Sequence, residues 1–193
     1  MHDDKQNDEV PTAVRVKRQF ICYAKKAIKH GIKDFDKVQG KYYLQDVISM
    51  ESDLGYMIRT VYAEMRGGDD NAKAIVAESI YNRSQLSSGY EKADGTYKGI
   101  VEKFYNVTKP NNNAYDYFNN PIEYIYENSA ETNAWRSSVS ASLKAHFGLS
   151  DVGKGVIFYN SSDSTYYDKN PKISKIDTLN VTHKGIKGLW KLK

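Results

Sequence analysis

Two stretches with apolar residues at helical spacing follow one another in the first half of the chain. The first predicts a helix with its apolar side formed by Leu54, Met57, Ile58, Val61 and Met65. The second predicts a helix over residues 72–86, with its apolar side formed by Ala72, Ile75, Val76, Ile80 and Leu86. Between them, Gly67 and Gly68 predict a left-handed backbone that ends the first helix. The residues at 69–71 offer an N-cap for the second.

Weaker patterns flank this pair of helices. Residues 12–30 and 42–50 have the spacing of short amphipathic helices, and residues 155–159 form an apolar strand with possible partners in 176–181 and 186–192. The fold class expected from these elements is α+β: a helix-dominated single domain with a small antiparallel sheet near the C-terminus. We divide the chain into a polar lead-in (1–11), a helical extension (12–50) and the main domain (51–193).

One carboxylate stands out within this pattern. Glu64 falls at the edge of the first apolar side, beside Met57 and close to the end of the predicted helix. The negative end of the helix dipole and the apolar neighbours both raise the pKa of such a carboxyl. A carboxyl that keeps its proton near neutral pH can act as the general acid in glycosidic bond cleavage. The alternative is an ordinary solvated glutamate at a helix end.

The second predicted helix carries two polar residues on its apolar side. Asn82 and Arg83 lie seven and eight positions after Ile75, so both project from that side. A buried guanidinium needs a carboxylate or several carbonyl partners. Arg83 therefore either ties the two helices together, through a carboxylate or the glycine turn, or orders a substrate.

Composition narrows the classes of function. The chain has 193 residues, 40% of them hydrophobic, and no apolar run approaches the length of a membrane span. Its net charge of +4 comes from dispersed lysines, which does not indicate nucleic acid as a partner. The single cysteine, Cys22, excludes an internal disulfide, and the four histidines lack metal-ligand spacing. We expect no metal and no cofactor.

Several blocks together resemble the SleB-type cell wall hydrolases. Residues 62–67, reading Tyr-Ala-Glu-Met-Arg-Gly, and a following helix that ends in Tyr-Asn-Arg at 81–83 match the signature of that family. Residues 98–101 with 104–108, the segment 137–148, and Gly-Val-Ile-Phe-Tyr-Asn at 155–160 are similar to later family blocks in the same order. The resemblance extends from Leu54 to the C-terminus.

This resemblance implies a fold and an activity. The fold would have a lysozyme-like cleft, and the activity would be cleavage of the bond between N-acetylmuramic acid (MurNAc) and N-acetylglucosamine (GlcNAc) in peptidoglycan. In a lytic transglycosylase, Glu64 would protonate the glycosidic oxygen and then act as base on the muramyl 6-hydroxyl, giving a 1,6-anhydro product. The candidate substrate-binding or site-ordering residues are Glu78, Asn82, Arg83, Thr108, Tyr159 and Asn160. Of these, Thr108 could contact Glu64 or the muramyl group.

The chain also departs from the family pattern, and alternatives follow from the departures. The family usually has a second glutamate where this chain has Gly68, and its C-terminal Gly-x-His block is replaced by residues 185–190. Glu78 occupies a position where the family has a small or apolar residue. A hydrolytic muramidase would use Glu78 or Asp69 as its second carboxylate. A glycan-binding or partner-binding protein without activity is the third interpretation.

The expected partner is the glycan strand of peptidoglycan, so the expected place of action is the cell wall or periplasm. Residues 1–11 contain no hydrophobic signal core. We therefore expect either a signal peptide removed from this chain or an export route that needs none. The sequence does not identify a protein inhibitor or an export partner. Spore germination, wall remodelling, phage lysis and antibacterial action all remain open as roles.

Overall fold

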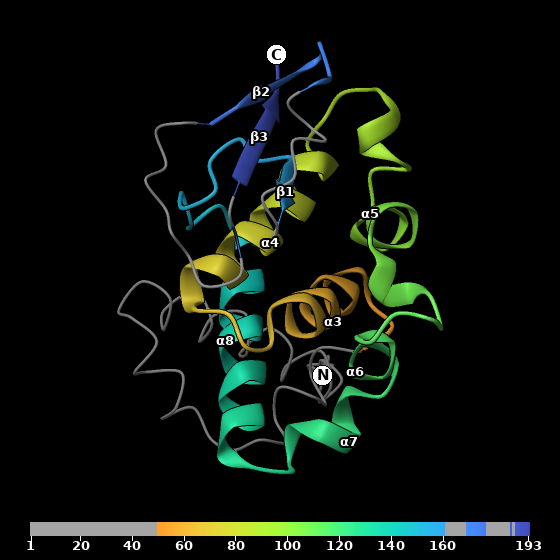
Figure 1. Ribbon diagram of the computed structural model, residues 1–193, viewed down its shortest axis with the longest axis vertical. Coiled ribbons are helices and arrows are strands. Elements are labelled where there is room, and N and C mark those ends of the chain that lie inside the picture. Colours follow the sequence, from red (N-terminus) through yellow and green to blue (C-terminus); the bar gives the residue numbers. More distant parts are fainter. Residues whose placement is uncertain (1–49, 161–168, 177–185, 187) are drawn as a thin grey trace, which may run out of the picture. The chain divides into compact units, whose positions relative to one another are not determined.

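The computed structural model describes residues 50–160, 169–176, 186 and 188–193 (Figure 1). The chain divides into two compact units, Met1–Ile48 and Ser49–Lys193, and every described residue belongs to the second. The predicted helix at 12–30, nearly all of the one at 42–50, and Cys22 lie outside the described residues. The described part is dominated by helices and has a small three-stranded antiparallel sheet near the C-terminus, which confirms the expected fold class at that level.

The first predicted helix is α3, Asp53–Met65. Ser52 caps it by accepting a hydrogen bond from the Gly55 amide (3.0 Å), and four of the five predicted apolar positions are buried. The predicted left-handed ending was wrong, because neither Gly67 nor Gly68 has a positive φ. Instead Arg66 keeps helical geometry, and the Gly68 amide closes a turn on the Met65 carbonyl (3.0 Å).

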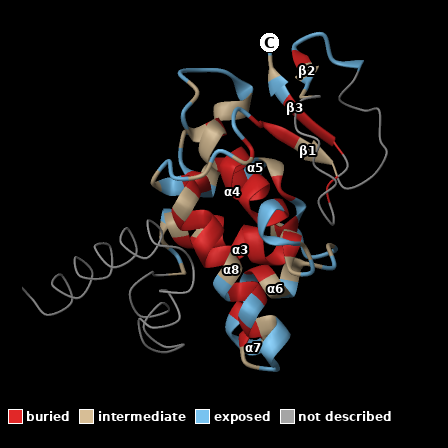
Figure 2. Cartoon of the chain, turned by 90° about the vertical axis from the view of Figure 1, so that its left-hand side faces the viewer, coloured by how far each residue is buried: buried red, intermediate tan, exposed pale blue. Residues whose placement is uncertain are grey.

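The second predicted helix is α4, Asp70–Ser84. As expected, a residue of the 69–71 segment caps it: the Asp69 carboxylate accepts a hydrogen bond from the Ala72 amide (2.8 Å). The predicted single apolar side was too narrow, because every residue from 72 to 80 is buried (Figure 2). Helices α3, α5 and α8 all contact α4, so this helix is the centre of the core and not an amphipathic surface helix.

The remaining helices surround α3 and α4. They are η2 (Tyr90–Lys92), α5 (Tyr97–Phe104), η3 (Asn106–Thr108), α6 (Tyr115–Asn119), α7 (Pro121–Ile125) and α8 (Ser129–His146). Helix α8 begins well before the predicted segment 137–148, because the Asn128 side chain caps it by accepting from the Glu131 amide (2.9 Å). Its end is close to the prediction, with Gly148 in the left-handed region at φ 64°.

Strand β1 is Phe158–Asn160, β2 is Ile173–Lys175 and β3 is Gly188–Leu192. Strand β3 lies in the middle and pairs antiparallel with both others. The predicted strand 155–159 begins three residues too early, since Gly155 is left-handed (φ 77°) and the Val156 amide turns back onto the Gly153 carbonyl (2.8 Å). Strand β2 precedes the predicted 176–181, most of which is outside the described residues. Strand β1 lies beside α4 (Figure 1).

Candidate functional site

Glu64 occupies the last turn of α3, where the sequence places it. Its neighbours Ala63 and Met65 are buried, whereas Glu64 itself is only partly buried. Burial raises the pKa of Glu64 from 4.5 to about 7, and a hydrogen bond from the Tyr159 hydroxyl works in the opposite direction. The predicted rise in pKa is thus confirmed, with burial as its cause. Near neutral pH this carboxyl can both donate and accept a proton.

The hydrogen bond from Tyr159 is part of a longer polar chain. Tyr159, on β1, is also hydrogen-bonded to Tyr105, which follows α5, and their ring centroids are 6.3 Å apart. The Tyr105 hydroxyl lies 2.7 Å from the Ser79 hydroxyl of α4. Tyr105 and Ser79 are both buried, and burial raises the pKa of Tyr105 to about 12. Four segments distant in sequence therefore contribute to one chain of polar groups ending at Glu64.

Sequence reasoning missed Tyr105 and Ser79. Tyr105 lies inside the block 104–108 that carries part of the resemblance, so that block was a usable signal. Ser79 had none, because a serine in the middle of a helix gives no indication of the side-chain partner that tertiary packing brings to it.

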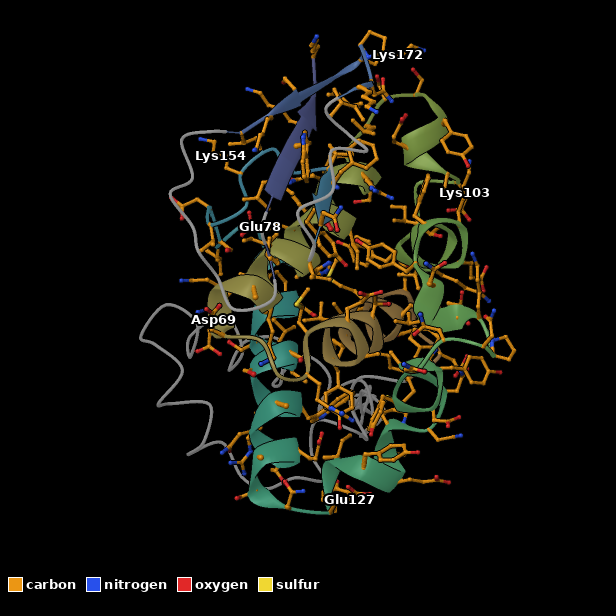
Figure 3. All side chains as sticks on the ribbon, in the orientation of Figure 1. Asp69, Glu78, Lys103, Glu127, Lys154 and Lys172 are labelled. Carbon is orange, nitrogen blue, oxygen red and sulfur yellow. The ribbon has the colours of Figure 1, made fainter. Side chains whose placement is uncertain are left out.

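Glu78 has a different environment from Glu64. It is 3% exposed, and its carboxylate accepts hydrogen bonds from the Ser150 hydroxyl and from the amides of Val152 and Gly153, the last at 2.9 Å. Burial raises the pKa of Glu78, and these hydrogen bonds oppose the rise. Figure 3 labels Glu78 on α4, near the loop that leads to β1. Its oxygens are occupied in fixing this loop.

Asn82 and Arg83 hold the next part of the same loop. The Asn82 amide donates to the carbonyls of Gly153 (3.2 Å) and Val156 (2.9 Å). Arg83 Nε donates to the Ile157 carbonyl (3.0 Å). Arg83 is buried as expected, but its partners differ from the predicted carboxylate or glycine turn. The pair ties α4 to the segment that enters β1.

Aromatic rings surround the rest of the Arg83 side chain. Its guanidinium carbon lies 4.2 Å from the centre of the Phe104 ring and 4.9 Å from that of Phe158. The charge therefore interacts with two ring faces inside the core. Arg83 consequently joins α4, the end of α5 and the start of β1.

The other predicted site residues have local roles in the structure. The Thr108 hydroxyl donates to the Tyr105 carbonyl (3.1 Å) and not to Glu64. Asn160 ends β1, opposite Gly188, and is partly buried. Asp69, the other candidate for a second carboxylate, caps α4, and Figure 3 shows it at the beginning of that helix.

The remaining residues of the Tyr-Ala-Glu-Met-Arg-Gly block contact a different part of the molecule. The Tyr62 hydroxyl donates to Glu131 of α8 (2.6 Å), and Arg66 Nε lies 3.5 Å from the same carboxylate. Arg66 also covers the ring of Tyr117 in α6, 3.6 Å from its centre. These contacts attach α3 to α6 and α8, and so fix the helix from which Glu64 projects.

The described residues contain neither a candidate metal site nor a helix that could span a membrane. Within them, no group of three or more His, Cys, Asp or Glu side chains is placed to hold a metal ion. None of the helices in the same ranges is long and apolar enough to cross a membrane. Comparison with protein-family models, with curated proteins and with solved structures finds no match for this chain. The site is therefore interpreted from its own chemistry.

Proposed function

We propose that this chain cleaves the glycan of peptidoglycan between MurNAc and GlcNAc, as a lytic transglycosylase of the SleB type with Glu64 as its one acid-base residue. The observation that carries the proposal is the state of Glu64. It is a partly buried carboxyl with a pKa of about 7 and a tyrosine donor on one side. General acid-base catalysis is most effective when the pKa of the catalytic group is near the working pH.

The number of available carboxylates favours a transglycosylase over a hydrolase. A hydrolysing glycosidase needs a second carboxylate as base or nucleophile. Both candidates are engaged: Glu78 of α4 by the loop at 150–153, and Asp69, which precedes α4, by capping the N-terminus of that helix. A substrate that supplies its own nucleophile removes the need for a second carboxylate.

The proposed reaction uses Glu64 twice. In the first step the protonated carboxyl gives its proton to the glycosidic oxygen as the bond to C1 of MurNAc breaks. In the second step the carboxylate takes the proton of the muramyl 6-hydroxyl, whose oxygen bonds to C1 and closes the 1,6-anhydro ring. Glu64 ends protonated, as it began. Because the attacking hydroxyl belongs to the same sugar, its effective concentration is high. The cleft that would hold the glycan is part of this proposal.

Digestion of purified peptidoglycan tests the proposal. The wild-type protein should release muropeptides that end in 1,6-anhydro-MurNAc and are lighter by one water than hydrolysis products, as read by mass spectrometry. Products with ordinary reducing ends would replace the transglycosylase by a muramidase. Binding to sacculi without release of any product would leave only a glycan-binding function.

Glu64→Gln should reduce the release of products by about a hundredfold or more, because glutamine cannot transfer the proton. The rate of the wild-type protein should fall as the pH rises through about 7, since the first step needs the protonated form of Glu64. The matched control is Glu102→Gln, an exposed glutamate of α5 that faces Lys98 across 3.8 Å. A folded Glu64→Gln protein that digests peptidoglycan at the rate of the control would refute the assignment.

A further inference from the structure

A buried chain of hydroxyl groups leads from the middle of α4 to Glu64. Its members are Ser79, Tyr105 and Tyr159, and it ends at the Glu64 carboxyl. We propose that Tyr105 is a positioning residue, which Ser79 holds in place and which directs the hydroxyl proton of Tyr159 towards Glu64. This inference rests on the proposed function only in treating Glu64 as the acid-base group.

The number of protons on these hydroxyl groups limits which of them can donate to which. Each hydroxyl has a single proton to donate, although its oxygen can also accept. The Tyr159 hydroxyl is hydrogen-bonded to both Glu64 and Tyr105, and its one proton can go to only one of them. The Tyr159 hydroxyl donates to Glu64 when the Tyr105 hydroxyl donates to Tyr159. The orientation of the Tyr105 hydroxyl therefore decides whether Glu64 receives a hydrogen bond.

Ser79 allows Tyr105 this orientation. The Ser79 hydroxyl lies 2.7 Å from that of Tyr105 and 2.8 Å from the Val76 carbonyl, and its one proton can go to either. Because Val76 lies within α4, its carbonyl also has the usual helical donor, the backbone amide four residues later. Ser79 can thus turn its proton to Tyr105 and leave no buried carbonyl unpaired. All three hydroxyl dipoles then point along the chain towards Glu64.

This alignment matters most when Glu64 is ionised. A hydrogen bond to a carboxylate is stronger than one between neutral groups, and donors in series polarise one another in a buried setting. In this proposal one oxygen of the Glu64 carboxyl accepts from Tyr159, and the other exchanges the proton with the substrate. No proton moves from one oxygen to another within the chain, because each hydroxyl group only rotates about its C–O bond.

The other charged groups near α3 are engaged elsewhere or exposed. Two charges act on Tyr105 in opposite directions: Arg83 of α4, whose guanidinium carbon lies 5.9 Å from the ring centre, lowers its pKa, and Glu64 raises it. On α4, Lys73 is bound to the Gly68 carbonyl, Glu78 is bound to the loop at 150–153, and Asp70 is exposed. On α8, Glu131 is bound to Tyr62 and Arg66, His146 is bound to Tyr97, Arg136 is exposed and Lys144 is partly buried. Lys98, Glu102 and Lys103 on α5 and Asp116 on α6 are exposed. The hydroxyl chain is therefore the contact through which the protein favours the ionised form of Glu64.

The test is a titration of the Glu64 carboxyl by NMR in protein carrying isotope-labelled glutamate, with its signal assigned by its loss in Glu64→Gln. Tyr105→Phe keeps the ring and removes the hydroxyl, so the ionised form of Glu64 loses support. The midpoint should rise by about half a pH unit or more. In the active enzyme, the fall in rate at alkaline pH should move upward by the same amount.

Tyr97→Phe is the matched control, because Tyr97 is equally buried (6% exposed) and its hydroxyl bonds to His146 (2.9 Å), outside the chain. It should leave the Glu64 midpoint unchanged. An unmoved midpoint in Tyr105→Phe, or an equal rise in Tyr97→Phe, overturns the inference. If Tyr105→Phe does not fold, Ser79→Ala is the deciding variant. We expect it to raise the Glu64 midpoint by a smaller amount, and an unchanged midpoint would contradict the proposal. Because the titration needs no substrate, it gives its answer even if the peptidoglycan digestion fails.

Discussion

At the scale of single residues, two glutamates on adjacent helices show how environment sets the properties of a carboxyl group. Both are raised in pKa by burial. Glu78 has three protein donors within reach and fixes a loop, whereas the Tyr159 hydroxyl is the donor that acts on the pKa of Glu64. A carboxyl with few fixed donors keeps a high pKa and an oxygen free for chemistry.

The elevated pKa of Glu64 also has a consequence for stability. Its pKa is about 7 in the folded chain against 4.5 when unperturbed, so the folded state binds the proton more tightly. The free energy of unfolding therefore decreases as the pH rises from 4.5 to 7. By pH 8 the ionised carboxyl should cost about 3 kcal/mol, as each pKa unit corresponds to ~1.36 kcal/mol.

Glu64→Gln should remove this cost, because glutamine has no charge to desolvate. The quantity to compare is the melting temperature of the variant minus that of the wild type. This difference should be several degrees larger at pH 8 than at pH 4. Thermal unfolding followed by circular dichroism at the two pH values measures this. A difference in melting temperature that is the same at both pH values would contradict the assigned pKa.

At the scale of elements, the turn between α3 and α4 is built differently from the end of α8. Gly67 has no positive φ, and a Cβ added there meets nothing within 4 Å. Gly148 also has open space around an added Cβ, but its φ is 64°. The two positions are a matched pair that differs in backbone conformation.

Gly67→Ala should leave the protein as stable as the wild type or more stable by about 0.4–1 kcal/mol, since alanine restricts the unfolded chain. Gly148→Ala should lower stability by about 1 kcal/mol, because the left-handed conformation is unfavourable for a residue with a Cβ. Denaturant unfolding of both variants measures the difference. Equal losses at the two sites would show that the α3–α4 turn also needs a glycine.

At the scale of the whole described unit, α4 joins the helical part to the sheet. Glu78, Asn82 and Arg83 project from α4 and bind the chain between residues 150 and 157. This segment leads directly into β1, which carries Tyr159 to Glu64. The stability of this link and the geometry of the candidate site therefore depend on the same residues.

Arg83→Ala tests that coupling. The change leaves the Ile157 carbonyl unpaired and an empty volume between Phe104 and Phe158, so the melting temperature should fall by several degrees. Activity on peptidoglycan should fall with it, because β1 loses its anchor. Arg136→Ala, at an exposed position of α8, is the control and should change both much less. Reduced activity with an unchanged melting temperature would instead indicate direct substrate contact by Arg83.

Much of the unit could be predicted because it is encoded locally. The spacing of apolar residues gives α3 and the existence of α4, and the capping residues at 69–71 give the N-cap of α4. The place of Glu64 at the edge of an apolar side gives its raised pKa. Each of these depends on residues within a few positions of one another.

Tertiary structure decided the rest, because the interactions join residues far apart in sequence. Arg83 and its carbonyl partner are separated by 74 positions, and the Tyr62 and Glu131 side chains by 69. Burial of α4 on all sides, which the apolar pattern did not reveal, follows from the helices that surround it. The sequence alone thus determined where the acidic group lies on its helix. Only the tertiary contacts of Tyr159 and Tyr105 decided which hydroxyl groups reach it, since no local pattern records a partner that the folded chain brings close.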